Sequence, residues 1–358
     1  MIYLLPMALF VWLLGFAKEQ TGLKQNNYKL YLIIAGTVIA LVMGLRTNYT
    51  GSTDTIVYIW RFEDICAFDN FFDYYRLNLQ EEKFLFAESG YYLFTWLLSR
   101  VTQEGQMLVL ITSCFITFGT CRFIYKNTQD PPLALLIYVC LGLFTFNMNG
   151  LRQAMAMSIC MMGYELVKKR KLLWFLVVVF IAMQFHKTAF CFIIVYLFPL
   201  FKEGKANVFW YLVGIVIFLF SVDQFIELAN VFTGEEYLTD YSAEGGGVVV
   251  VMIYIGTIAL SLIMIDSMRE RQKRTQFLCV VLGFAMYISR YFSNQILERL
   301  SYYFFYFTLP LIPNLIGDLE EREQRIVKIM FCLFALFLFA YRLDKGLFNN
   351  FRFYFQMG

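Results

Sequence analysis

Histidine is nearly absent from this 358-residue chain, and charged residues are scarce. The single histidine, His186, cannot supply a metal site with the usual ligand spacings. Seven of the eight cysteines lie in or beside apolar runs, so the sequence predicts neither a zinc site nor a disulfide framework. Charged residues make up 16% of the chain, whereas ordinary soluble domains contain roughly 25%. This scarcity excludes a soluble domain.

Long apolar runs fill the chain instead, and hydrophobic residues make up 59% of it. A helix needs about 20 apolar residues to cross a bilayer. A membrane β-barrel would alternate polar and apolar residues, so only helices fit this composition. The sequence predicts an all-α polytopic integral membrane protein with about 11–13 transmembrane helices, in one transmembrane domain covering 1–358. We place the spans near 1–17, 29–45, 106–124, 132–147, 152–167, 172–185, 188–201, 207–226, 247–267, 275–292, 299–317 and 326–341.

The basic residues predict the orientation of these spans. With the spans as placed, one side of the membrane receives 18 basic and 10 acidic residues, and the other receives 12 basic and 17 acidic residues. By the positive-inside rule, the basic side faces the cytoplasm. Its turns are Lys18 to Lys29, Arg122 to Lys126, Lys168 to Lys171, Lys202 to Lys205, Arg269 to Arg274 and Arg322 to Lys328.

Two long loops fall on the external side. Residues 47–87 combine acidic and aromatic clusters, which favours short amphipathic helices that form a rim or lid at the interface. Residues 227–246 are acidic and lead into glycines, which indicates a mobile loop. The run 88–101 fits the topology only as a short helix that dips into the outer leaflet, unless one of its neighbours is the partial crossing.

Polar residues that are costly in lipid gather at the external ends of the spans. Ionisable groups at such positions indicate function by default. Guanidinium forks bind phosphate oxygens in a bidentate manner, so the arginines predict a pocket for an anionic substrate such as a lipid diphosphate. The residues are Arg46, Asp54, Glu88, Asn149, Arg152, Gln153, His186, Arg290, Glu298 and Arg299.

Several of these residues also have a structural interpretation. Arg46 and Arg290 could anchor span ends at the interface by snorkelling. Glu298 and Arg299 could pair with each other, and a lone histidine is more often structural than catalytic. The pair Arg152-Gln153 is harder to explain in this way, because it follows a break between two apolar runs at Asn149-Gly150.

The order and spacing of these residues resemble the EpsG family of bacterial membrane proteins, which belongs with the Wzy-type polysaccharide polymerases. Five segments placed on the same membrane face carry the resemblance. They are Arg46-x4-Gly51-x2-Asp54-x3-Tyr58, Glu88-x-Gly90-Tyr91, Asn149-Gly150-Leu151-Arg152-Gln153-x2-Ala156, Phe185-His186-x2-Ala189, and Glu298-Arg299 before Tyr302.

The resemblance implies a metal-independent enzyme without cofactors that joins undecaprenyl-diphosphate-linked oligosaccharide units into capsule, exopolysaccharide or O-antigen. It implies a fold like that of membrane glycosyltransferases with polyprenyl-linked donors. The site would face the external side of the bacterial cytoplasmic membrane. A flippase and a chain-length regulator are the expected protein partners, and nucleic acid is not expected. Asp54, Glu88 and His186 compete for the role of base. The expected substrate-binding residues are Arg46, Tyr58, Asn149, Arg152, Gln153, Arg290, Glu298 and Arg299.

Two other functions remain open on the sequence. A flippase would also bind lipid-linked sugar, but it should place polar groups along a path through the membrane, and here the middle of most spans is apolar. A membrane acyltransferase would also use a histidine at the membrane surface, but one within reach of a cytoplasmic acyl donor. The predicted topology places His186 outside.

Overall fold

The computed structural model describes residues 3–20, 28–47, 53–81, 88–202, scattered positions between 207 and 224, and 247–291, 295–345, 348 and 351–356. Helices dominate these residues, and the one β-bridge among them joins Arg46 to Phe353. The predicted span 207–226 is described only at scattered positions, and the predicted loop 227–246 lies outside the described residues.

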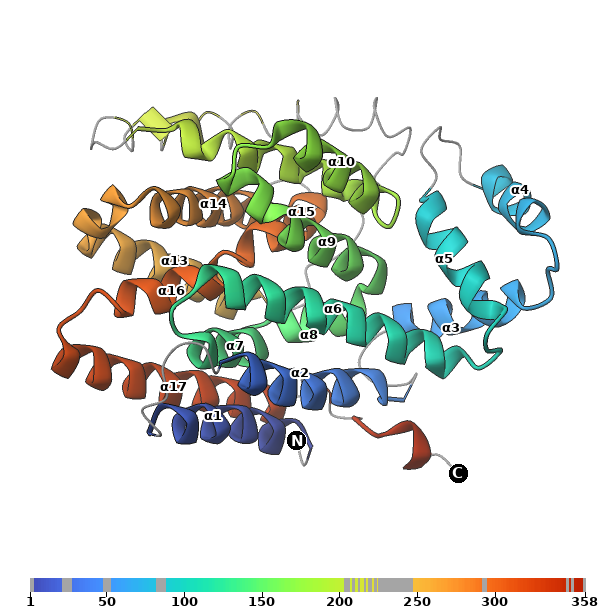
Figure 1. Cartoon of the computed structure of the whole chain (residues 1–358), viewed down its shortest axis with the longest axis horizontal. Helices are drawn as coiled ribbons and strands as arrows, with labels where there is room; N and C mark the ends of the chain where they lie inside the picture. Colours follow the sequence, from blue (N-terminus) through green and yellow to red (C-terminus); the bar gives the residue numbers. More distant parts are fainter. Residues whose placement is uncertain are drawn as a thin grey trace.

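Most helices form a bundle along the long axis of the molecule (Figure 1). They are α1 (Leu4–Gln20), α2 (Tyr28–Gly44), α6 (Gly105–Asn127), α7 (Pro131–Cys140), α8 (Leu143–Asn149), α9 (Leu151–Lys168), α10 (Leu172–Met183), η2 (Lys187–Tyr196), η3 (Phe198–Leu200), α13 (Gly247–Ile263), η4 (Ile265–Arg269), α14 (Arg271–Ile288), η5 (Ser289–Tyr291), α15 (Gln295–Phe305), α16 (Thr308–Ile316) and α17 (Glu321–Asp344). One continuous apolar core extends through the bundle from Leu4 to Phe351.

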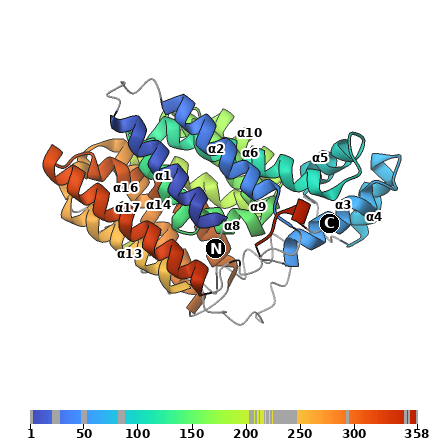
Figure 2. The same ribbon diagram turned by 90° about the horizontal axis from the view of Figure 1, so that it is seen from below.

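Three shorter helices gather at one end of the bundle. They are α3 (Thr53–Ile65), α4 (Phe71–Glu81) and α5 (Ser89–Ser99), drawn in blue and cyan at the right of Figures 1 and 2. The first two lie in the region predicted to form amphipathic helices. The third, α5, corresponds to the short helix predicted over 88–101. The C-terminal segment with η6 (Tyr354–Gln356) folds back to the same end, where the Thr47 amide donates to the Arg352 carbonyl at 2.9 Å.

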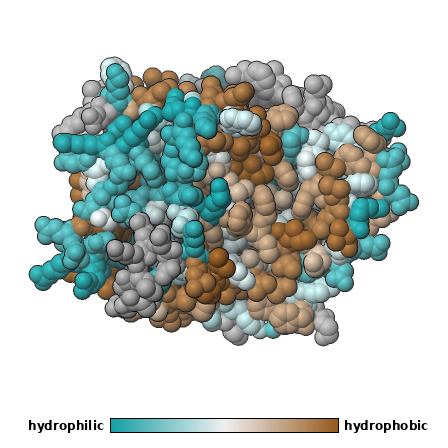
Figure 3. Space-filling view, in the orientation of Figure 1, coloured by the Kyte–Doolittle hydropathy of each residue, from teal (hydrophilic) through white to brown (hydrophobic). Residues whose placement is uncertain are grey.

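The surface and the helix lengths fit a membrane protein. Among the described residues, α6 and α17 are long and apolar enough to cross a bilayer, and the bent pair α7 and α8 could make a third crossing. Outward-facing apolar side chains are common, such as Ile33 at 64% exposure and Phe337 at 69%. Hydrophilic residues lie toward the two ends of the view in Figure 3, with a hydrophobic area between them. The chain is therefore an all-α integral membrane protein, and its number of crossings stays a prediction.

Several predicted spans are not continuous α-helices within the described residues. The span 132–147 is broken into α7 and α8, which meet at 55°. Gly142 at the break has φ +119°, a conformation that other residues rarely adopt. The span 299–317 is divided into α15 and α16, because Pro310 has no N–H to bond back to Tyr306. The span 188–201 is a 3₁₀ segment.

Candidate functional site

A buried carboxylate at the start of α5 holds together two residues from distant parts of the chain. Glu88 Oε2 forms an ion pair with Nη1 of Arg152, in the first turn of α9. Glu88 Oε1 accepts a hydrogen bond from the Lys187 backbone N–H at 3.2 Å and lies 3.5 Å from Nδ1 of His186. The sequence predicted all three of Glu88, Arg152 and His186, and the structure brings them together.

The three side chains differ in accessibility. The Glu88 side chain is 7% exposed, whereas those of Arg152 and His186 are 22% and 16% exposed. Glu88 is therefore the most buried residue of the cluster, and a substrate would contact Arg152 and His186. The pairing also explains how a carboxylate can be buried here, because a buried charge is tolerated when it is paired and hydrogen-bonded.

One hydroxyl group contacts the histidine, and a second hydroxyl group contacts the first. His186 Nδ1 lies 2.9 Å from the Thr188 hydroxyl, which in turn lies 3.2 Å from the Tyr303 hydroxyl. The Thr188 backbone N–H donates to Nδ1 at 3.3 Å, which suits the tautomer with its proton on Nε2. The Glu88 carboxylate beside Nδ1 suits the other tautomer, which leaves the lone pair of Nε2 available as a base. Glu88 and Thr188 thus orient the imidazole ring.

Aromatic rings flank the arginine. The Arg152 guanidinium lies 5.9 Å from the centroid of the Tyr58 ring and 5.6 Å from that of the Tyr91 ring. The two rings are 6.3 Å apart in an edge-on arrangement. Burial raises the pKa of Tyr58, an effect that the positive charge of Arg152 opposes. Tyr58 is therefore neutral at physiological pH, and its phenol can donate a hydrogen bond.

Helix N-termini converge on the same place. Gly150 precedes the 18-residue α9 and Glu88 precedes α5, and neither helix has a side-chain cap. The first amide of η2 donates to Glu88, and the Tyr91 amide in the first turn of α5 donates to the Gln184 carbonyl at 2.9 Å. The aligned peptide dipoles of α9 give its N-terminus a positive potential, which favours an anionic ligand.

Two polar atoms beside Gly150 lack a hydrogen-bond partner. They are Oδ1 of Asn149 and Nε of Arg152, and both are buried. Among the described residues neither atom is satisfied, although buried polar atoms are nearly always paired. Both atoms are therefore available to a substrate that enters next to the Glu88–Arg152 pair.

Arg46 has a different environment from that of Arg152. Its side chain is 1% exposed and donates to the carbonyls of Met43 and Met148, with Thr55 Oγ1 at 3.4 Å. These contacts tie the end of α2 to the end of α8 and to the first turn of α3. The geometry favours a role for Arg46 in building the site over direct contact with a substrate.

The remaining predicted residues are spread around this cluster. Gln153 donates to the Arg299 backbone carbonyl at 2.6 Å, which joins α9 to α15, while the Arg299 side chain is exposed and Glu298 is half-buried. Asp54 is exposed in the first turn of α3, one turn before Tyr58. The Arg290 side chain lies outside the described residues.

Sequence reasoning gave no role to Tyr91, Thr188, Tyr303 or Gln184. Tyr91 follows Glu88 by three residues, a spacing that places both on one side of a helix. Gly90 marks a close approach, because a Cβ there would lie 2.6 Å from that of Gln184. The contact between Thr188 and Tyr303 joins distant segments and had no signal in the sequence. Within the described ranges, no group of three His, Cys, Asp or Glu residues could hold a metal ion.

Comparison with known proteins gives one match that covers most of the chain. The sequence model of the EpsG family matches residues 29–354. That range includes every residue of the cluster described above. No curated protein matches the sequence, and no solved structure matches the fold.

Proposed function

Because this chain belongs to the EpsG family, we propose that it joins undecaprenyl-diphosphate-linked oligosaccharide units into a capsular, exopolysaccharide or O-antigen chain. Proteins of the EpsG type are Wzy-like polysaccharide polymerases, and this chain is a membrane protein of that general kind. The donor, the acceptor and the membrane face are parts of our proposal.

The observation that carries the proposal is the Glu88–Arg152–His186 cluster. Arg152 is fixed on one edge by a buried carboxylate, yet its side chain is 22% exposed and its buried Nε has no partner. A guanidinium held in this way can bind a second anion in a defined orientation. An arginine for the leaving diphosphate next to a histidine for the attacking hydroxyl is the arrangement that glycosyl transfer requires.

In the proposed reaction, a sugar hydroxyl of one lipid-linked unit attacks the anomeric carbon of the growing chain. A new glycosidic C–O bond forms, and the bond between the anomeric carbon and the diphosphate oxygen breaks. Undecaprenyl diphosphate leaves with the bonding electrons, and Arg152 stabilises its charge. Nε2 of His186 accepts the hydroxyl proton in the tautomer whose Nδ1 proton faces Glu88.

We favour His186 over the other candidate bases. Glu88 is buried and already paired with Arg152, which makes it a positioning residue. Asp54 is exposed and remains the alternative base. The external location rests on the distribution of basic turns and the positive-inside rule. Growth outside the cytoplasm also suits a polymer that is destined for the cell surface.

The proposal can be tested in cells that make the complete lipid-linked unit. A polymerase without its base should still allow single units to appear on the cell surface while long chains are lost. Removal of a general base costs about 10² to 10⁴ in rate, so His186→Ala should shift the surface polysaccharide to its shortest form. Asp69→Asn, at a fully exposed acid of the same external region, is the control and should leave chain length unchanged.

The same experiment distinguishes the alternatives. If Asp54→Asn and not His186→Ala removes the long chains, Asp54 is the base. If both variants trap single units inside the cell, the protein is a flippase and the polymerase proposal is wrong.

A further inference from the structure

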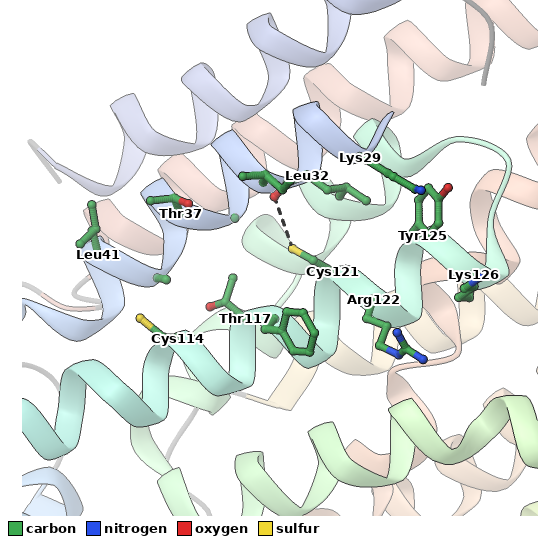
Figure 4. A pocket seen from close by; sticks show the side chains of 14 residues that line it. Lys29, Leu32, Thr37, Leu41, Cys114, Thr117, Cys121, Arg122, Tyr125 and Lys126 are labelled. Atoms are coloured by element: carbon green, nitrogen blue, oxygen red, sulfur yellow. Dashed lines mark hydrogen bonds between the residues drawn. The ribbon is translucent and has the colours of Figure 1, made fainter. Parts of the chain in front are cut away.

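A groove lies between α2 and α6, away from the cluster around Glu88. These two helices pack along much of their length, and the groove between them has a volume of about 590 Å³ (Figure 4). It extends from Lys29 near the start of α2 to Leu41 near its end. At 1.5 Å per residue this distance is about 18 Å, which is slightly more than half of the roughly 30 Å hydrocarbon core.

The walls of the groove are apolar, and its side toward the lipid is open. Ile33 of α2 and Phe118 of α6 line it and are 64% and 61% exposed. At its floor the helices approach closely at Gly36, where a Cβ would lie 3.0 Å from the sulfur of Cys121. A groove with these properties accepts a hydrocarbon chain from the bilayer.

One end of the groove is basic. Lys29, Arg122 and Lys126 line this end together with the ring of Tyr125, and Figure 4 labels all four residues. The two lysine ammonium groups lie 5.7 Å and 5.6 Å from the centroid of that ring. Among the described residues, none of these three cations pairs with a carboxylate. The two lysine ammonium groups thus lie near one ring, and no carboxylate within the described ranges balances their charge.

We propose that this groove binds an anionic phospholipid of the cytoplasmic leaflet. The phosphate would lie between Lys29, Arg122 and Lys126, and one acyl chain would follow the groove toward Leu41. The basic end belongs to two of the turns that the positive-inside rule assigns to the cytoplasm, and anionic lipids are attracted to basic clusters at that surface. The groove length fits an acyl chain of one leaflet, whereas a polyprenyl chain is several times longer.

The site is distinct from the proposed catalytic cluster and does not depend on it. The basic turns lie at the start of α2 and the end of α6, whereas Arg46 and the cluster lie near the opposite ends of these helices. A lipid in the groove would fill the gap between α2 and α6 and so brace the helix that leads to Arg46.

The binding can be measured by native mass spectrometry of the purified full-length protein with equal amounts of phosphatidylglycerol and phosphatidylcholine of matched chains. We expect the protein to retain phosphatidylglycerol at least about tenfold better, because each basic side chain near a phosphate contributes severalfold. Replacement of Lys29, Arg122 and Lys126 by Gln should abolish this preference. The control variant replaces three exposed basic residues outside the groove by Gln, namely Lys169, Lys171 and Arg269. This control should retain the preference for phosphatidylglycerol.

A second variant tests the groove itself without a change of charge. Thr37 lines the groove and is exposed, so Thr37→Trp should fill the groove and reduce retention of both lipids. Equal retention of the two lipids by the unmodified protein would overturn the proposal. So would equal losses in the groove variant and the control, or displacement of phosphatidylglycerol by undecaprenyl phosphate. A dimer that Thr37→Trp abolishes with no change in lipid retention would assign the groove to a second copy of the chain.

Discussion

Arg152 differs in its environment from Arg46, another arginine that the sequence placed at a span end and whose side-chain contacts the structure describes. It is held by Glu88, flanked by Tyr58 and Tyr91, and partly exposed. Arg46 shares its residue type and its place at a span end, but it is fully buried against carbonyl groups. Both arginines could be selected as candidate site residues from the sequence, because a charge near lipid is costly and indicates a function. Their different roles could not be predicted, because the role of Arg46 depends on its contacts with the carbonyls of Met43 and Met148.

The planar fork of Arg152 should be needed for activity. Arg152→Lys keeps the positive charge but cannot bind both Glu88 and a phosphate in the same geometry. We expect the rate of polymerisation to fall at least about tenfold while membrane insertion is retained. Chain length on gels and protein amount in membranes measure the two effects. Arg100→Lys, at the residue that follows α5, is the matched control. Unchanged chain length in both variants would give Arg152 a structural role.

Glu88 should matter for stability as well as for activity. Glu88→Ala leaves Arg152 without its partner in a mostly buried site, which costs about 3 kcal/mol. Asp54→Ala removes an exposed acid and should change the free energy of unfolding by less than about 0.5 kcal/mol. Thermal unfolding in detergent followed by fluorescence compares the two. Equal unfolding midpoints would mean that the Glu88–Arg152 pair contributes nothing to stability.

At the scale of helices, the positions of the site residues depend on breaks within the predicted spans. Positions of most helices followed from apolar runs, and the short α5 followed from the need to keep basic turns on one side. The break at Gly142 was not predicted, because a glycine in an apolar run is compatible with a continuous helix until φ is known. Gly142 precedes α8, and Gly150 separates the end of α8 at Asn149 from the start of α9 at Leu151, so that Arg152 lies in the first turn of α9.

Backbone conformation at Gly142 should therefore be costly to change. A Cβ at Gly142 would have room, with its nearest neighbour Val250 at 3.7 Å, so Gly142→Ala tests the positive φ and not crowding. We expect a loss of about 1–3 kcal/mol in the free energy of unfolding. Gly256→Ala in α13, where a Cβ meets nothing within 4 Å, should be neutral or slightly stabilising. A neutral Gly142→Ala would mean that the bend between α7 and α8 does not depend on this glycine.

At the scale of the whole molecule, the proposed function requires the Glu88–Arg152–His186 cluster to face the outside of the cell. Single cysteines introduced at Thr50 and Glu235 should react with an impermeant reagent added to intact cells. Cysteines at Lys169 and Arg269 should react only after lysis, because these exposed residues belong to the basic turns. Lys273 would be a poor probe of the same side, since it is buried in ion pairs with Glu270 and Asp318. If a cysteine introduced at Lys169 reacted with the reagent in intact cells, the Glu88–Arg152–His186 cluster would face the cytoplasm.

The most direct test of the proposed function uses the purified full-length protein and a synthetic undecaprenyl-diphosphate-linked repeat unit. A polymerase should convert this single substrate into a ladder of products on a gel, with release of undecaprenyl diphosphate. We expect the ladder from the unmodified protein and from Arg100→Lys, and only its shortest rungs from His186→Ala. If the unmodified protein makes no ladder but moves the lipid-linked unit across a vesicle membrane, the protein is a flippase and the function proposed for the Glu88–Arg152–His186 cluster is wrong.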